Sequence, residues 1–204
     1  MARRSDHSRA ELHVLALAAA RKIAEQEGLR GLSARRIARE IGYTIGTIYN
    51  LFEDLDDLIV QMNGRTLDTL YEACAAAPTD GEPKADLHTL AGCYIGFIRN
   101  HPKLWNVLFE HHLPDGKALP DWHSEKILRL LAFIETALTP LFPPDREAER
   151  HHSARVLWSS LHGICSLESA GKLIQTESVE RLSDTLIETY LMGLGYRAVC
   201  KEGH

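Results

Sequence analysis

Apolar residues recur every three and four positions along almost the whole chain, and this period restricts the chain to helices. In residues 8–27, for example, Leu12, Leu15, Ala16 and Ile23 fall on one face of a helix. No segment of strand length alternates between apolar and polar residues. We therefore predict an all-α protein.

Glycines, prolines and capping residues divide the chain into nine predicted helices. Gly28 is placed to end the first helix, while Ser33, Thr44 and Asp54 are placed to cap the second, third and fourth. The helices are predicted at about 8–27, 33–42, 44–51, 55–76, 84–99, 102–111, 121–139, 145–173 and 178–194.

The overall composition is that of an ordinary globular protein, with 45% hydrophobic and 25% charged residues in 204. Its longest apolar runs are too short to span a bilayer, and the basic start of the chain is not followed by a signal-type apolar segment. We therefore expect a cytoplasmic protein.

Charge is distributed unevenly along the chain. Residues 1–52 contain nine Lys and Arg against five Asp and Glu, whereas residues 53–204 contain fourteen against twenty-three. The whole chain has a net charge of −5, but its basic start can present a local basic face, which is what binding to a polyanion requires.

No pattern in the sequence indicates catalysis or a metal site. The four cysteines form no C-x-x-C pair, and residues 84–194 lack the nucleophile elbow, the H-E-x-x-H motif and a glycine-rich phosphate loop. Eleven histidines are present, but the adjacent pairs His111-His112 and His151-His152 point to different helix faces. We expect solvated or capping histidines, no metal, no cofactor and no enzyme activity.

Residues 33–51 have the organisation of a helix-turn-helix. The second predicted helix turns Ile37 and Ile41 inward, and Gly42 permits the tight turn that lets the third helix project into a groove of DNA. Arg35, Arg36 and Arg39 face outward, where they either contact phosphates or form a solvated charged surface.

The exposed side of the third helix carries side chains suited to DNA. Hydroxyls of Thr44, Thr47 and Tyr49 can donate to phosphates, Asn50 can pair with adenine, and Ile45 can touch a thymine methyl. A glycine within this helix, at position 46, lowers its stability, so it needs a reason. Either the DNA backbone or the first helix approaches closely there.

The run "LALAAARKIAEQEGLRGLSARRIAREIGYTIGTIYNLFEDLDDL" from Leu15 to Leu58 resembles the DNA-binding domain of the TetR family of transcriptional regulators. The matching marks include Ser33, the Gly42 turn, "GTIY" at 46–49 and Phe52. The resemblance implies phosphate contacts from Ser33, Thr44, Thr47 and Tyr49, and base-edge positions for Ile45 and Asn50. It also places Leu55 where the family commonly has a lysine that contacts DNA.

Four acids follow the third helix, at positions 53, 54, 56 and 57. Asp54 is placed to cap the fourth helix, and Asp56 and Asp57 lie in its first turn, where the helix dipole favours them by about 0.3 to 1 kcal/mol each. Their spacing matches no calcium loop, so we expect them to be structural.

The C-terminal part contains "LWSSLHGICSLES" at 157–169, with Trp158 and His162 four residues apart on one helix face. This W-x-x-x-H-G arrangement is similar to a ligand-binding subtype of the TetR family named for a Trp-His-Gly signature. A buried tryptophan beside a hydrogen-bonded core histidine explains the pattern equally well.

Large apolar side chains on the middle helices, with a few polar ones, indicate a pocket for a small molecule. Most aromatic residues at helical spacing belong to a plain core, so only a minority are expected to touch a ligand. The candidates are Tyr94, Phe97, Ile98, Trp105, Leu108, Phe109, His112, Trp122, Trp158 and His162.

The last two predicted helices are amphipathic, and with a twofold copy they would form a four-helix interface. We predict a helix-turn-helix DNA-binding domain over 1–54 and a ligand-binding and dimerisation domain over 55–204. The predicted function is a homodimeric, ligand-responsive repressor of a near-palindromic operator on double-stranded DNA, with an unidentified small-molecule effector. The alternative is a helical enzyme or metal-binding protein whose head docks a protein partner.

Overall fold

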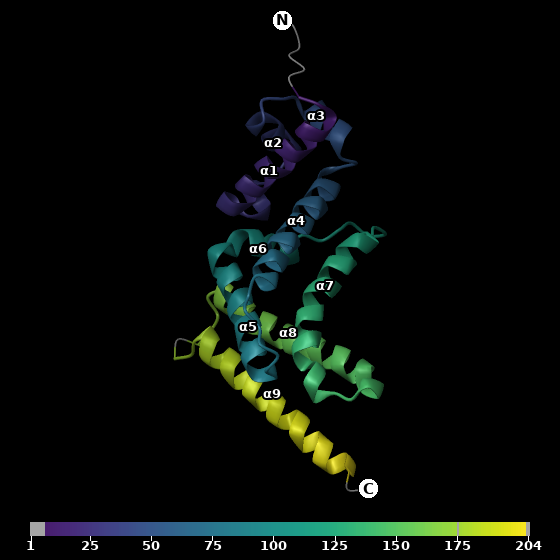
Figure 1. The fold of residues 1–204 in the computed structure, drawn as a ribbon. Coiled ribbons are helices and arrows are strands. Elements are labelled where there is room, and N and C mark those ends of the chain that lie inside the picture. Colours follow the sequence, from purple (N-terminus) through teal and green to yellow (C-terminus); the bar gives the residue numbers. More distant parts are fainter. Residues whose placement is uncertain (1–6, 175, 203–204) are drawn as a thin grey trace, which may run out of the picture. The chain divides into compact units, whose positions relative to one another are not determined.

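The structure, a computed structural model, describes residues 7–174 and 176–202 and is all-helical over them (Figure 1). The described residues contain nine α-helices, which confirms the predicted fold class. Three short 3-10 helices, at Leu29–Gly31, Thr139–Leu141 and Pro144–Arg146, lie between them. The α-helices are α1 (Arg9–Glu27), α2 (Ala34–Glu40), α3 (Ile45–Leu51), α4 (Leu55–Ala75), α5 (Pro83–Asn100), α6 (Pro102–Glu110), α7 (Asp121–Leu138), α8 (Glu147–Ser169) and α9 (Val179–Glu202).

The ends of α8 and α9 differ from the prediction. α8 ends at Ser169, four residues before the expected end, because Gly171 adopts a left-handed conformation with φ 64°. The amides of Gly171 and Lys172 then donate to the carbonyls of Glu168 and Leu167, each at 2.8 Å, which closes the helix. α9 continues past the expected end at 194 to Glu202.

The chain folds into two compact units. The first contains the chain up to Thr69 together with His101–Lys126, and the second contains Leu70–Asn100 and the chain from Ile127 onward. The predicted functional boundary between residues 54 and 55 is a separate matter and stays a prediction.

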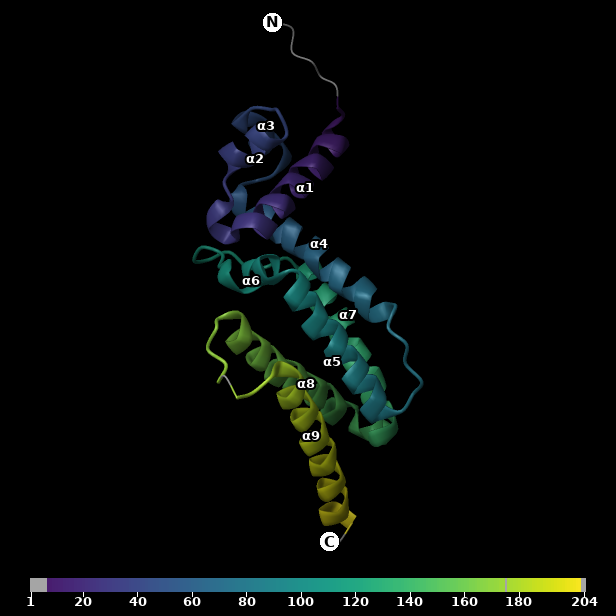
Figure 2. The same ribbon diagram turned by 90° about the vertical axis from the view of Figure 1, so that its left-hand side faces the viewer.

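Five helices of the first unit, whose ribbons can be followed in Figure 2, contribute side chains to one apolar core. Ile37 of α2 and Ile48 of α3 are fully buried against the alanine-rich face of α1. α4 adds Leu58, and α6, which packs against α1, adds Leu104 and Val107. The N-terminal half of α4 is therefore a structural part of the head that carries α3.

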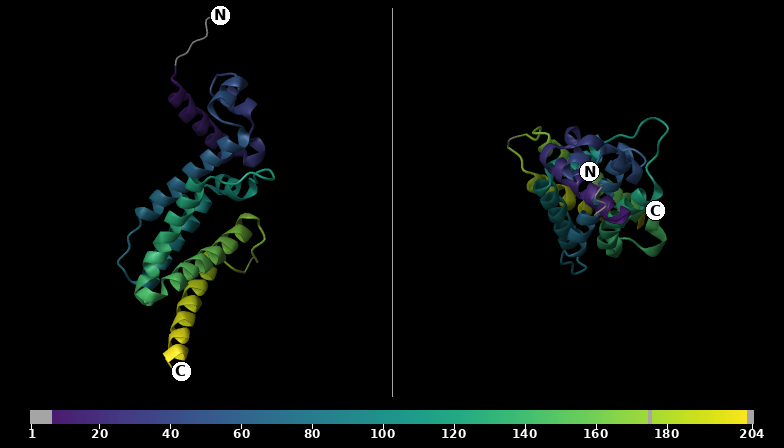
Figure 3. Two further views of the ribbon diagram at one scale, coloured as in Figure 1. Left: turned by 90° about the vertical axis from the view of Figure 1, so that its right-hand side faces the viewer. Right: turned by 90° about the horizontal axis from the view of Figure 1, so that it is seen from above.

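In the second unit, α5 packs against α8 and α9, and α8 packs along α9 (Figure 3). Arg99 at the end of α5 donates to Glu168 of α8 at 2.9 Å and also pairs with Glu180 of α9. This arginine fastens three helices of the unit together. None of the described helices has the length and apolarity needed to cross a membrane.

Candidate nucleic-acid interface

The turn between α2 and α3 is built by local hydrogen bonds. Ser33 caps α2, as predicted, because its hydroxyl accepts from the amide of Arg36 at 3.3 Å. Gly42 has φ 76°, a conformation that favours glycine, and the next amide, of Tyr43, donates to Ala38 at 2.9 Å. These contacts fix the direction in which α3 leaves the turn.

One face of α3 packs into the core of the head, and the opposite face is exposed to solvent. Ile48 is 0% exposed in the core of the head, whereas Ile45 and Tyr49 are 42% and 53% exposed. These two side chains are four residues apart, so they lie next to each other on the exposed face of the helix. Thr44, Gly46 and Asn50 are also exposed, and Thr47 is half-buried.

The threonine hydroxyls lie together at the start of α3. Thr44 is the N-cap residue of this helix, as predicted, but its side chain forms no capping hydrogen bond. The two hydroxyl oxygens of Thr44 and Thr47 lie 3.2 Å apart, and the amide of Thr47 donates to the backbone carbonyl of Thr44 at 2.9 Å. One hydroxyl hydrogen of the pair thus remains free to donate to an acceptor such as a phosphate oxygen.

The surroundings of Gly46 distinguish between the two predicted reasons for a glycine there, which are close packing against α1 and close approach of the DNA backbone. A Cβ at this position would meet only the Thr44 hydroxyl, at 3.8 Å. Close packing against α1 is therefore not the reason for this glycine. The open space over Gly46 leaves the approach of an external backbone as the explanation that fits.

The three arginines of α2 differ in what holds them. Arg36 is half-buried and pairs through two nitrogens with Glu27 of α1, so its guanidinium serves the fold of the head. This bond lowers the pKa of Glu27. Arg35 and Arg39 are exposed, and their side chains form no hydrogen bond or ion pair with the part of the chain that the structure describes. Those two are the cations best placed for phosphates.

Two contacts at this surface have no signal in the sequence. His7 Nδ1 lies 2.9 Å from the Tyr43 hydroxyl, and Arg9 donates to the carbonyl of Asn50 at 3.2 Å. They join the start of α1 to the turn and to the end of α3. Because each joins positions more than thirty residues apart, periodicity and capping patterns do not reveal them.

The acids that follow α3 are structural, as predicted. Asp54 caps α4 by accepting from the amide of Asp57 at 2.8 Å, and Asp57 accepts from the amide of Glu53 at 3.0 Å. Lys117 pairs with Asp54, and that hydrogen bond is the main reason why the pKa of Asp54 is lowered. Asp56 Oδ1 lies 2.8 Å from His111 Nε2. The acidic start of α4 is thus partly neutralised by the connection between α6 and α7.

Leu55 is partly buried and packs against the core of the head. A leucine at this position therefore contributes apolar contact to the head, which a lysine would supply only through its methylene groups.

Comparisons with known proteins assign the chain to a family. Residues 16–62 match the sequence model of the family described as "Bacterial regulatory proteins, tetR family". Residues 87–190, about half of the chain, match the model described as "Tetracyclin repressor-like, C-terminal domain". The chain belongs to the TetR family of transcriptional regulators. The second match includes the Trp158, His162 and Gly163 positions of the C-terminal signature.

Relatives of this TetR-family regulator carry similar descriptions. The HTH-type transcriptional regulator YobS of Bacillus subtilis (strain 168) is 27% identical over 183 residues, which cover 86% of this chain and 88% of the relative. An HTH-type regulator of Staphylococcus aureus (strain COL), SACOL2593, is 41% identical over 49 residues, only 24% of this chain and 26% of that one.

Solved structures share the fold at low identity. A protein with unknown function from Rhodococcus sp. RHA1 superimposes with a TM-score of 0.69 at 23% identity, covering 93% of this chain and 97% of that one. A TetR transcriptional regulator from the same strain gives a TM-score of 0.67 at 16% identity, covering 91% and 98%.

In the second unit, the structure brings together part of the predicted ligand set. Tyr94 is buried, with its hydroxyl 2.9 Å from His162 Nδ1, and Nε2 of that histidine lies 3.2 Å from the Ser166 hydroxyl. The Trp158 ring stacks on His162 with centroids 5.6 Å apart. Burial lowers the pKa of His162, so the ring is favoured in its neutral form. Both ring nitrogens have partners, which matches the core-histidine interpretation.

The remaining candidates for ligand binding are dispersed. Phe97 and Ile98 are buried in α5 of the second unit. In the first unit, Trp105 is buried, Phe109 is 40% exposed, Leu108 is half-buried and Trp122 packs on α4. His112 is exposed and bonds the carbonyl of Glu110 at 2.9 Å. A ligand site built from this set stays a prediction.

Proposed function

We propose that this protein is a ligand-responsive repressor that binds a near-palindromic operator as a homodimer in the cytoplasm. The observation that carries the proposal is the outward face of α3, where Ile45 and Tyr49 are exposed beside Thr44, Gly46 and Asn50. The opposite face of the same helix is anchored by the fully buried Ile48. A rigid helix that presents methyl, hydroxyl and amide groups is suited to the major groove.

The groups that would bind phosphates surround this face. Hydroxyls of Ser33, Thr44, Thr47 and Tyr49 supply neutral contacts, and the exposed Arg35 and Arg39 supply charge. Arg36 is assigned to the fold of the head because Glu27 holds its guanidinium. The proposal therefore gives each head two cations toward DNA.

Dimerisation would use α8 and α9. These helices leave large apolar side chains in solvent, with Leu167 at 47% and Met192 at 76% exposure. Val156, Leu161 and Ile164 of α8 are also only partly buried. A second copy that covers these side chains would gain hydrophobic free energy and would bring two reading helices to adjacent turns of the duplex, about 34 to 36 Å apart.

Release of DNA would follow from a shift of α4. The N-terminal half of this helix is part of the core of the head through Leu58, Ile59 and Met62, so the head moves with it. A small effector that prefers one position of α4 would change the spacing of the two heads. The effect on DNA affinity cannot exceed the effector's differential affinity for the two positions.

The rival function is a helical enzyme or metal-binding protein. Among the described residues, no group of three or more His, Cys, Asp and Glu side chains is arranged to hold a metal ion. Tyr94, His162 and Ser166 form a hydrogen-bonded chain beside the stacked Trp158 ring, and residues 84–194 lack the nucleophile-elbow and H-E-x-x-H patterns of enzymes that use such groups. The regulator is the function that we adopt.

Selection of duplexes from a random pool by the purified protein tests the proposal. We expect enrichment of a near-palindrome whose half-sites lie one helical turn apart, and no enrichment by an Ile45→Ala, Tyr49→Phe double variant that remains folded. Enrichment of an asymmetric site would contradict the dimer, and the absence of any enriched sequence would contradict operator binding.

A further inference from the structure

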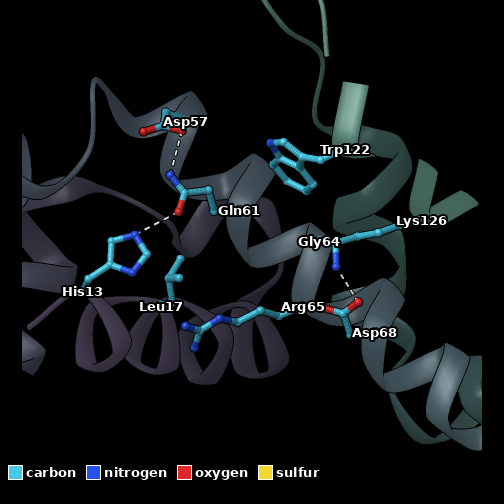
Figure 4. Close-up of a pocket in the computed structure, with 9 residues that line it drawn as sticks. All are labelled: His13, Leu17, Asp57, Gln61, Gly64, Arg65, Asp68, Trp122 and Lys126. Carbon is cyan, nitrogen blue, oxygen red and sulfur yellow. Dashed lines mark hydrogen bonds and ion pairs between the residues drawn. The ribbon is translucent and has the colours of Figure 1, made fainter. Parts of the chain in front are cut away.

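A groove in the first unit, away from the reading helix, has the features of a binding site (Figure 4). Its floor is one face of α4, formed by residues at positions 57, 61, 64 and 68. One wall is α1 with Leu17, and the other is the start of α7 with Trp122. The cavity measures about 260 Å³, slightly less than the sites that hold drug-sized molecules.

Gly64 gives this groove its depth. A Cβ on Gly64 would lie 2.6 Å from Cζ3 and 3.0 Å from Cη2 of Trp122, so any larger residue would displace the indole. A glycine in the interior of a helix costs about 1 kcal/mol relative to alanine, and here the close approach of the indole explains it. The indole is only partly buried, and the rest of its surface borders the cavity.

Most polar groups that line the groove already have partners. Asp57 accepts from Gln61 Nε2 at 2.8 Å, and Gln61 Oε1 lies 2.8 Å from His13 Nε2. Lys126 of α7 pairs with Asp68 of α4. Each set satisfies its own polar atoms and leaves little hydrogen-bonding capacity for a ligand.

Arg65 is different. This residue is half-buried and lines the cavity, but its side chain forms no hydrogen bond or ion pair with any residue that the structure describes. Figure 4 shows this side chain extended along the groove toward Leu17. A partly desolvated guanidinium without an acceptor is unfavourable, and its five donors match a carboxylate in a two-point bond.

We propose that this groove binds a small organic carboxylate. The carboxylate pairs with Arg65, and the apolar part of the molecule lies against Leu17 and Trp122. Because α1, α4 and α7 all line the groove, an occupant connects the helices that position the head. The consequence for DNA rests on the proposed function, whereas binding of the carboxylate does not.

Calorimetric titration with benzoate, in the absence of DNA, tests the site. Benzamide has nearly the same shape without the charge and serves as the control probe, and inorganic phosphate distinguishes an organic carboxylate from any anion. The variants are Arg65→Gln and Arg65→Lys, with Arg30→Gln as the matched control, since Arg30 is an exposed arginine of the same unit outside the groove. Circular dichroism checks that each variant is folded.

We expect benzoate to bind the wild type and Arg30→Gln equally, and to bind Arg65→Gln at least about tenfold more weakly. Arg65→Lys should be intermediate, because lysine keeps the charge and loses the planar fork. The proposal is overturned if the wild type does not bind benzoate at millimolar concentration, if Arg65→Gln binds as the wild type does, or if benzamide or phosphate binds as well as benzoate.

A second titration separates this inference from the proposed function. Benzoate should change the affinity of the wild type for the selected duplex and leave that of Arg65→Gln unchanged. Benzoate binding without any DNA binding would contradict the proposed function and keep the site. DNA binding without benzoate binding would overturn the site alone.

Discussion

Ile45 and Ile48 of α3 give the clearest contrast between a side chain that binds DNA and one that stabilises the fold. Ile48→Ala removes three carbons from a side chain that is 0% exposed. At about 0.8 kcal/mol for each buried carbon group, the transfer contribution is about 2.4 kcal/mol, and the cavity left behind raises the total cost to about 3 to 5 kcal/mol. Ile45→Ala removes the same carbons from a side chain that is 42% exposed and should cost less than about 1 kcal/mol.

The assay is urea denaturation followed by circular dichroism, at one fixed protein concentration because a dimer's stability depends on it. Fluorescence anisotropy with a labelled operator then measures DNA affinity below the unfolding transition. We expect Ile48→Ala to lower the free energy of unfolding strongly. Ile45→Ala should leave the free energy of unfolding nearly unchanged. It should weaken operator binding by about tenfold or more, since an apolar contact to a base contributes to discrimination between bases.

Equal destabilisation by the two substitutions would refute this account of α3, because it would place both side chains in the core. Normal operator affinity of Ile45→Ala would equally refute the assignment of its exposed face to DNA.

Three further outcomes follow from the same contacts. Tyr49→Phe and Thr47→Ala should each weaken DNA binding, by about tenfold for the tyrosine, while the melting temperature changes little; a large drop in melting temperature would make them core residues. Leu55→Lys should raise the affinity for DNA of any sequence and steepen the salt dependence of binding by about one phosphate contact per protomer. The same substitution should lower the stability of the protein, because Leu55 packs on the core of the head. Unchanged DNA affinity would contradict the interpretation that a phosphate-binding lysine is missing at this position. Burial lowers the pKa of His123 and His162, so the unfolded chain, with histidines titrating near about 6.5, binds protons more readily than the fold. The free energy of unfolding should therefore fall as the pH decreases below about 6.5, by at most about 1.4 kcal/mol per pH unit for each histidine. Urea denaturation at several pH values should show that the free energy of unfolding depends less steeply on pH in His162→Gln than in the wild type. The same pH dependence in both proteins would contradict a lowered pKa of His162.

Helix positions were predictable from the sequence because they depend on local signals. The period of apolar residues located all nine helices, and Ser33 and Asp54 were identified as caps because their side chains reach amides three residues away. The end of α8 also has a local origin, because Gly171 in a left-handed conformation stops the helix before the predicted end.

Contacts between distant positions were not predictable. The pairing of Arg36 with Glu27 and of Lys117 with Asp54 depends on how helices pack, and a single sequence does not specify which of many charges meet. The same limit applies to Arg65, whose lack of a partner becomes visible only when the neighbours of α4 are known.

The salt dependence of operator affinity tests the central claim most directly. If Arg35 and Arg39 are the cations of each head that contact phosphates, a dimer neutralises about four phosphates. The logarithm of the binding constant should then fall linearly with the logarithm of the salt concentration, with a slope of about −3.6. Arg35→Gln should reduce the magnitude of this slope by about 1.8, because each dimer loses two phosphate contacts. Arg36→Gln should leave the slope unchanged and lower the stability of the protein, because it removes the ion pair with Glu27. An affinity that does not respond to salt, or a slope unchanged by Arg35→Gln, would contradict the assignment of this face to DNA.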